Sequence, residues 1–157
     1  LRVQGTHGSV LLTGDIEAAQ EAALVARSAA ALKSDVLLVP HHGSRTSSTA
    51  AFLDAVAPQV AVVQAGYRSR YGHPAPDVLA RYAARGIRVE RSDRCGAWTW
   101  QAGQGGPGMQ AVKAVAAVTD VKALTAAPAV QSAQSVQSMC TRTERRRYWH
   151  HAFAPLD

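Results

Sequence analysis

The sequence has 157 residues, a formal net charge of +6 and a hydrophobic fraction of 47%. This length suits one domain, or one domain with a tail, and the hydrophobic fraction is ordinary for a globular protein. No apolar run approaches the length of a membrane span and no signal peptide is visible, which argues against a membrane-embedded segment in this stretch. The modest positive charge is compatible with a polyanionic partner.

The first part of the chain predicts a β-hairpin followed by a helix. Residues 1–3 and 9–13 have the composition of two strands, joined by a polar turn that contains glycine and His7. Residues 16–32 are rich in alanine and have the spacing of a helix. Asp15 stands between the second strand and this helix. It can cap the helix, which its spacing alone favours, or it can bind a metal ion through its carboxylate.

Residues 35–48 concentrate the polar chemistry of the chain. Residues 36–39 are a short apolar run stopped by Pro40, which predicts a strand buried on both faces. Two histidines and a glycine follow at once, and a hydroxyl-rich stretch then leads into a helix that starts near residue 49. The residues of interest are His41, His42, Gly43, Ser44, Thr46, Ser47 and Ser48. Open α/β folds build sites at this place, between the carboxyl end of a buried strand and a helix.

The same residues also have a purely structural interpretation. Histidines after a strand are often only solvated or hydrogen-bonded, and serines before a helix are usually caps, a role open to Ser47 and Ser48. Histidine is also the commonest metal-ligand side chain, and the amino end of a helix favours anions. Because so many of these residues fall within one turn, we favour a functional site.

The rest of the first hundred residues continues to alternate between strands and helices. The predicted helices cover residues 49–56 and 76–85, and the predicted strands cover 60–63, 88–91 and 97–100. Pro76 opens the second of these helices and Gly86 ends it. The loop before it is basic and aromatic, with Tyr67, Arg68, Arg70, Tyr71 and His73. This order of elements predicts an α/β fold, in which helices pack on a mixed or mostly parallel sheet.

The character of the sequence changes after residue 100. A glycine-rich linker at 101–108 and low-complexity sequence at 131–138 precede a basic and aromatic cluster at 142–151. We expect one domain over residues 1–100 and a flexible linker and tail over 101–157. The cluster has the composition to contact nucleic acid or a membrane surface, but a solvated tail is the better interpretation. Cys95 and Cys140 form no motif, so the sequence alone gives no reason to predict a disulfide between them.

Three short motifs stand in order along the chain: L-L-T-G-D at 11–15, V-P-H-H-G-S at 39–44 and R-Y-G-H-P at 70–74. With S-D-R-C-G-A at 92–97, they resemble the carboxyl-terminal metallo-β-lactamase-like domain of the bacterial ComEC/Rec2 competence proteins, over about residues 1–100. The resemblance implies half of an αββα sandwich, with helices packed on a mixed sheet. It also implies two divalent metal ions, manganese or zinc, and no organic cofactor.

The resemblance further implies roles for individual residues. Asp15 corresponds to the aspartate that bridges the two metals, and one of His41 and His42 corresponds to a histidine ligand, for which we favour His42. His41 then faces the substrate phosphate, and His73 lines the same cleft as an acid or as a second phosphate donor. The expected phosphate-binding set consists of Gly43, Ser44, Thr46, Ser47, Ser48, Arg68 and Arg70.

The function implied by the resemblance is that of a metal-dependent nuclease domain, acting on DNA during uptake across the bacterial inner membrane. Its partners are DNA and the remainder of the same protein. Arg68 and Arg70 favour DNA because they can pair with phosphate, while Tyr67 or Tyr71 can stack on a base. Two alternatives stay open. One is another hydrolase of the superfamily, acting on phosphoesters or lactones, and the other is a catalytically inert structural half-domain.

The sequence departs from the family in one large respect. The superfamily's first metal motif, H-x-H-x-D-H, is absent, and the remaining histidines, His7, His150 and His151, do not replace it. The first residue is Leu1 rather than Met, and it already belongs to a predicted strand. We therefore expect a fragment, the second half of the domain, whose metal site is incomplete and which is inactive alone.

Overall fold

The computed structural model of the chain describes residues 1–101 and 137–141. Its main sheet has five strands in the order β1 (Arg2–Gly5), β2 (Gly8–Leu12), β3 (Val36–Leu38), β4 (Val60–Val63) and β5 (Arg88–Arg91). The β1–β2 pair is antiparallel and the later pairs are parallel, so the sheet is mixed. The helical elements are α1 (Ala18–Ser28), η1 (Ala29–Leu32), η2 (Pro40–Gly43), α2 (Ala50–Val56), α3 (Pro76–Ala83) and α4 (Ser92–Cys95). The predicted α/β class is confirmed.

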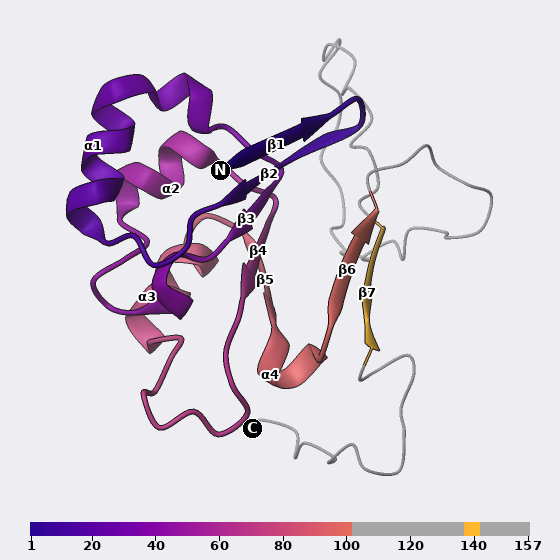
Figure 1. The fold of residues 1–157 in the computed structure, drawn as a ribbon. Coiled ribbons are helices and arrows are strands. Elements are labelled where there is room, and N and C mark those ends of the chain that lie inside the picture. Colours follow the sequence, from indigo (N-terminus) through magenta and orange to yellow (C-terminus); the bar gives the residue numbers. More distant parts are fainter. Residues whose placement is uncertain (102–136, 142–157) are drawn as a thin grey trace, which may run out of the picture.

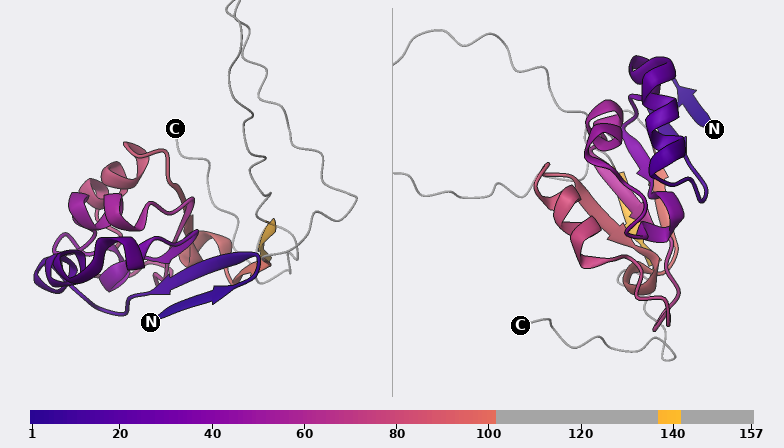
Figure 2. Two further views of the ribbon diagram at one scale, coloured as in Figure 1. Left: turned by 90° about the horizontal axis from the view of Figure 1, so that it is seen from above. Right: turned by 90° about the vertical axis from the view of Figure 1, so that its left-hand side faces the viewer.

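The two faces of the main sheet are covered differently. Figure 1 shows α1, α2 and α3 on one side of the sheet and the β6–β7 ribbon, formed by Trp98–Gln101 and Gln137–Cys140, on the other. Figure 2 shows the same three helices gathered on one side when the molecule is turned. Strand residues alternate between the faces. Leu37 and Ala61 belong to the core under the helices, whereas Val36, Val60 and Val62 form a second cluster, against which the tryptophans of β6 pack.

Local sequence explains where several elements begin and end. Val60–Val63 is buried throughout and forms β4 as predicted. Pro76 is in the first turn of α3, where its missing N–H costs nothing. Gly86, with a φ of 65°, follows that helix. The helix predicted over 16–32 is shorter, because α1 ends at Ser28 and the chain tightens into the 3₁₀ turn η1, which buries Leu32 in the core.

A second, two-stranded sheet occupies the end of the described chain. The predicted strand at 97–100 is present as β6, but it pairs with β7 and does not join the main sheet. A disulfide joins Cys95 to Cys140 across 45 positions of sequence. Residues 137–141 of the expected tail therefore belong to the folded part. The rest of that tail, including the cluster at 142–151, lies outside the described residues.

Within residues 1–101 and 137–141, none of the helices has the length and apolar character needed to cross a membrane.

Candidate functional site

Two of the predicted site residues meet at the carboxyl ends of neighbouring strands. Leu12 of β2 pairs with Leu38 of β3 in a parallel ladder, and the chain leaves both strands at the same edge of the sheet. Asp15 follows β2 and His42 follows β3, and their Oδ1 and Nε2 atoms lie 3.6 Å apart. The two residues to which the resemblance assigns metal-binding roles therefore lie side by side.

The ring orientation of His42 suits a metal ligand. Its Nδ1 lies 2.8 Å from the carbonyl oxygen of Gln64, which follows β4. The carbonyl can only accept, so Nδ1 carries the proton, and in the neutral ring the lone pair is on Nε2. Nε2 lies 3.6 Å from Oδ1 of Asp15, a separation that fits a cation bound by both atoms. Histidines that bind metals usually donate their second N–H in this way.

The turn that carries the histidines has an unusual backbone. His41, His42 and Gly43 have φ values of 47°, 55° and 82°, all in the left-handed region. For the two histidines this conformation is unfavourable, and such residues cluster at functional sites. The amide of His41 donates to the carbonyl of Gly14 over 3.1 Å, which ties the turn to the loop of Asp15.

Gly43 allows the loop of His73 to approach this turn. A Cβ at Gly43 would lie 2.6 Å from Cβ of Pro74, so no larger residue fits without movement. The amide of Ala75 also donates to the Gly43 carbonyl over 2.9 Å. As a result, the His73 ring centre lies 6.1 Å from that of His41. Among the residues that the structure describes, none gives a hydrogen bond to the buried Nδ1 of His73, so this polar atom is unsatisfied.

Glu17 belongs to the site, although the sequence analysis did not identify it. Its Oε1 lies 3.0 Å from Nδ1 of His41 and accepts a 2.9 Å hydrogen bond from the Thr46 hydroxyl. Thr46 in turn contacts the hydroxyl of Ser44 at 3.1 Å. The sequence signal was a second acid two positions after Asp15, at the amino end of a predicted helix. Glu17 is indeed the N-cap residue of α1.

Ser47 and Ser48 require a correction. Both are fully buried, so their side chains are not available to a phosphate in this structure. The Ser47 hydroxyl donates to the carbonyl of Pro40 over 2.8 Å, and the Ser48 hydroxyl lies 3.0 Å from that of Tyr82. Neither serine caps α2, whose N-cap is Thr49. The signal was misleading because hydroxyls in a loop serve internal hydrogen bonds as readily as ligands.

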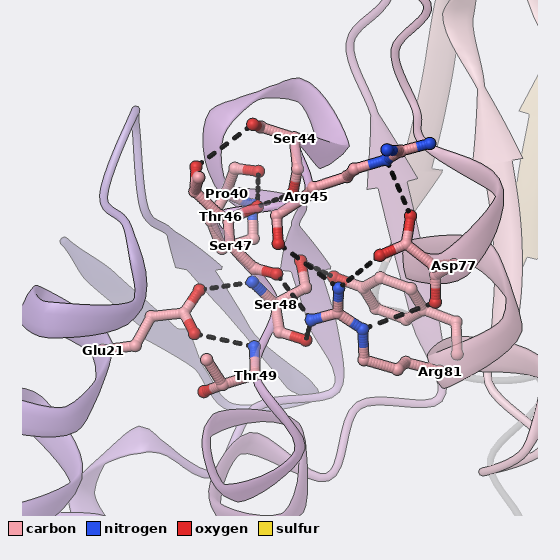
Figure 3. A network of polar contacts seen from close by, with 11 residues as sticks. Glu21, Pro40, Ser44, Arg45, Thr46, Ser47, Ser48, Thr49, Asp77 and Arg81 are labelled. Carbon is pink, nitrogen blue, oxygen red and sulfur yellow. Dashed lines mark hydrogen bonds and ion pairs between the residues drawn. The ribbon is translucent and has the colours of Figure 1, made fainter.

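The amide groups that precede α2 are satisfied by a carboxylate that the sequence analysis missed. Glu21 of α1 is fully buried, and it accepts hydrogen bonds of 2.6 and 2.8 Å from the amides of Ser48 and Thr49 (Figure 3). A negative side chain at the amino end of a helix is favourable. Glu21 therefore occupies the position at which the sequence analysis expected an external anion.

Arg68 and Arg70 are on the loop between β4 and α3 that also carries His73. The guanidinium carbon of Arg68 lies 5.3 Å from the ring centre of Tyr67, and that of Arg70 lies 5.1 Å from the ring centre of Tyr71. Both tyrosines are exposed, by 43% and 68%. The rings of Tyr71 and His73 are nearly parallel, and their centres lie 6.3 Å apart. The loop thus extends from the histidines to an exposed basic and aromatic surface.

Asp15 and His42 alone do not complete a metal site. Zinc sites commonly use three or four protein ligands, so these two supply part of one. Among residues 1–101 and 137–141, the one group of three potential ligands consists of Glu90, Cys95 and Cys140. Its cysteines are joined in the disulfide and lack the thiolates that bind metals, so this group does not support a second centre.

Comparison with known proteins adds the family context of these motifs. The chain is 42% identical to a competence protein, ComA, of Neisseria gonorrhoeae over 105 residues, which are 67% of this chain and 15% of that protein. It is 40% identical to ComE operon protein 3 of Bacillus subtilis over 56% of this chain and 11% of that protein. It is 44% identical to recombination protein 2 of Haemophilus influenzae over 50% of this chain and 10% of that protein.

The chain is a homologue of the ComEC/Rec2 competence proteins. No protein-family model matches the sequence. The chain spans only 10% to 15% of the length of these ComEC/Rec2 relatives, so it corresponds to a small segment of each of them.

Proposed function

We propose that this chain supplies part of the active site of a metal-dependent phosphodiesterase that acts on DNA, within a competence DNA-uptake protein. The observation that carries the proposal is the pair formed by Asp15 and His42, whose Oδ1 and Nε2 atoms are 3.6 Å apart. The fold of the complete domain is proposed to be of the metallo-β-lactamase type. Its location would be the inner membrane, as part of the longer protein.

The proposed metal ligands are Asp15 and His42, with further ligands contributed by the H-x-H-x-D-H motif that this sequence lacks. Divalent ions, manganese or zinc, would supply an activated water and offset the charge of the phosphate. The hydrogen bond from His42 Nδ1 to the Gln64 carbonyl supports this assignment because it leaves the lone pair of the neutral ring on Nε2, which lies 3.6 Å from Asp15.

The groups proposed to bind the phosphate surround this pair. His41 and the half-buried Ser44 lie on the same turn, and Thr46 is exposed next to them. Glu17 accepts a 2.9 Å hydrogen bond from Thr46, and its Oε1 lies 3.0 Å from Nδ1 of His41. His73 approaches from the opposite loop and is proposed as the acid for the leaving oxygen, a role that suits a histidine near neutral pH.

DNA is the proposed substrate because of the surface that continues from His73. Exposed aromatic rings next to arginines are suited to single strands, in which a base stacks on the ring and the phosphate pairs with the cation. Tyr71 lies beside His73 and carries Arg70 over its ring, and Tyr67 carries Arg68 in the same way. A lactone or a small phosphoester would make no use of this surface.

A second candidate is a structural half-domain without activity. It is favoured by the small number of ligands, since no group of three potential metal ligands forms around Asp15 in the described part of the chain. The two candidates differ in one experiment. A protein that carries both this segment and the H-x-H-x-D-H half is assayed for cleavage of a DNA oligonucleotide with manganese or zinc. Cleavage that chelation abolishes supports the hydrolase, and its absence under both metals supports the inert half-domain.

A further inference from the structure

The loop behind the histidine turn is held by one arginine of α3. Nη1 of Arg81 donates to the carbonyls of Ser47 and Ser48 over 2.9 and 2.8 Å, and Nη2 approaches the carbonyl of Arg45 at 3.4 Å (Figure 3). Nη2 also pairs with the Asp77 carboxylate at 3.1 Å. We call these contacts with the carbonyls of residues 45, 47 and 48 the Arg81 clamp.

The Arg81 clamp completes a loop that is held from two sides. Glu21 of α1 binds the amides of Ser48 and Thr49, while Arg81 of α3 binds the carbonyls. Figure 3 shows the two charged side chains approaching the loop from different elements. The Ser47 hydroxyl extends the connection by donating to the carbonyl of Pro40, the residue immediately before His41. The contacts therefore run from Arg81 to the turn that carries the histidines.

The same helix also fixes the other histidine. α3 begins at Pro76, three positions after His73, and the amide of Ala75 donates to the carbonyl of Gly43. Arg81 thus fastens the body of α3 to the loop after the histidine turn, while the start of α3 fastens to the turn itself. Both attachments join the elements that carry His41 and His73, whose ring centres lie 6.1 Å apart.

We propose that Arg81 is a positioning residue, which holds the His41–His42 turn against His73 through the loop of residues 44–48. The importance of this arrangement for catalysis rests on the function proposed above. The claim that Arg81 maintains the arrangement does not. A guanidinium suits the task because its planar fork presents several donors in fixed directions. A lysine ammonium at the same place retains the charge but offers no fork for three carbonyls.

Arg85 provides a matched control. Its side chain is 24% exposed, compared with 26% for Arg81, and it also pairs with an aspartate, Asp54, at 2.7 Å. Its further hydrogen bonds go to the carbonyls of Ala50 and Arg81. It therefore joins α2 to the end of α3 without being part of the clamp. Loss of Arg85 removes a comparable amount of charge and packing.

The test uses the 157-residue chain with Arg81→Lys, Arg81→Ala and Arg85→Ala. Thermal unfolding reports stability, and the nuclear Overhauser contact between the imidazole rings of His41 and His73 reports their position. We expect Arg85→Ala to lower the melting temperature and to keep the contact. We expect Arg81→Lys to fold and to lose the contact, and millimolar guanidinium to restore it in Arg81→Ala.

The proposal is overturned if Arg81→Lys keeps the contact between the rings, or if Arg85→Ala loses it to the same extent. Should Arg81→Ala fail to fold, Arg81→Lys decides the question alone. None of these measurements uses metal or DNA. Absence of nuclease activity in the complete domain would therefore reject the proposed function and leave the positioning role of Arg81 to be judged on the ring contact.

Discussion

Nε2 of His42 lies 3.6 Å from Oδ1 of Asp15, although the two residues are on different strand-to-helix connections. Parallel pairing of β2 with β3 produces this proximity, because it brings the carboxyl ends of both strands to one edge of the sheet. We expect metal binding to depend on both residues. In the complete domain, Asp15→Ala and His42→Ala should each remove metal and abolish turnover, because the nucleophile is lost with the metal.

The measurement for this pair is metal content beside nuclease rate. Asp54→Ala is the control, since its carboxylate is 64% exposed, close to the 68% of Asp15, and pairs with Arg85 instead of a histidine. Full activity in Asp15→Ala would reject the metal-dependent function and leave the aspartate as a loop residue. For the 157-residue chain alone, calorimetry with manganese or zinc should give only weak binding. Tight stoichiometric binding would contradict the two-ligand interpretation.

His73 should affect the rate without affecting the metal. Its ring is placed beside His41 and is not paired with Asp15. In the complete domain, His73→Ala should keep its metal content and lower turnover by about a hundredfold or more, as is typical for the loss of an acid–base group. His7→Ala, at the hairpin turn, is the matched histidine control and should leave both quantities unchanged. Loss of metal in His73→Ala would instead make this residue a ligand.

The arginines of the β4–α3 loop should affect DNA binding more than chemistry. Arg68→Ala and Arg70→Ala should each weaken binding of an oligonucleotide and reduce the slope of log K against log salt by about one. Hydrolysis of a small phosphodiester should change little. Arg27→Ala on α1 removes the same charge at an exposed position and serves as the control. An equal effect of Arg27→Ala would indicate that net charge, rather than this loop, binds DNA.

The buried hydroxyl of Tyr82 should make the folded protein less stable at alkaline pH. Burial raises the pKa of the Tyr82 hydroxyl well above its ordinary value, and the hydrogen bond with Ser48 opposes the shift. The tyrosine of the unfolded chain loses its proton near pH 10, while the folded one keeps it. Stability from this group is therefore present below about pH 10 and is lost as the pH rises further.

Denaturant unfolding from pH 8 to 11 measures this loss. Tyr82→Phe lacks the titrating hydroxyl, so its free energy of unfolding should decline less above pH 10. Loss of the hydrogen bond with Ser48 should lower the stability of this variant by about 1 kcal/mol at every pH. Tyr71→Phe, at an exposed position, should retain the decline of the unaltered protein. Identical profiles for Tyr82→Phe and the unaltered protein would show that other groups cause the alkaline loss.

The disulfide should stabilise the attachment of β7. A bond that closes a loop of 45 positions removes entropy from the unfolded chain worth about 4 kcal/mol in the simplest model. We expect Cys140→Ser, or reduction of the unaltered chain, to lower the melting temperature measured by circular dichroism. Adding reductant to Cys140→Ser should produce no further change. A melting temperature that is the same with and without reductant in the unaltered chain would contradict this expectation.

Much of the fold was predictable because its signals are local. The apolar run of β4 stands between Pro58 and Gln64, so its bounds follow from the sequence alone. Pro76 and Gly86 mark the region of α3 for similar reasons. The proximity of Asp15 and His42 follows from a general rule, that the carboxyl ends of neighbouring parallel strands share an edge of the sheet.

The missed features depend on contacts between distant residues. Nothing around Glu21 indicates that it will bind amides 27 and 28 positions later, and Arg81 resembles any exposed helix arginine. The strand β7 has the polar sequence Q-S-M-C, which lacks a periodic apolar pattern. The pairing of β7 with β6 and the disulfide between Cys95 and Cys140 both join residues that are far apart in the sequence. The local sequence therefore contains no signal for either.

The bond between Cys95 and Cys140 also makes the intervening chain a covalent ring. A protease that cuts one peptide bond within this ring opens it without separating the two pieces, and they come apart only after reduction. Cysteines stay reduced in the cytosol and become paired in the periplasm or outside the cell. Whether a cut chain migrates as one band or two on a non-reducing gel therefore records the compartment in which it folded.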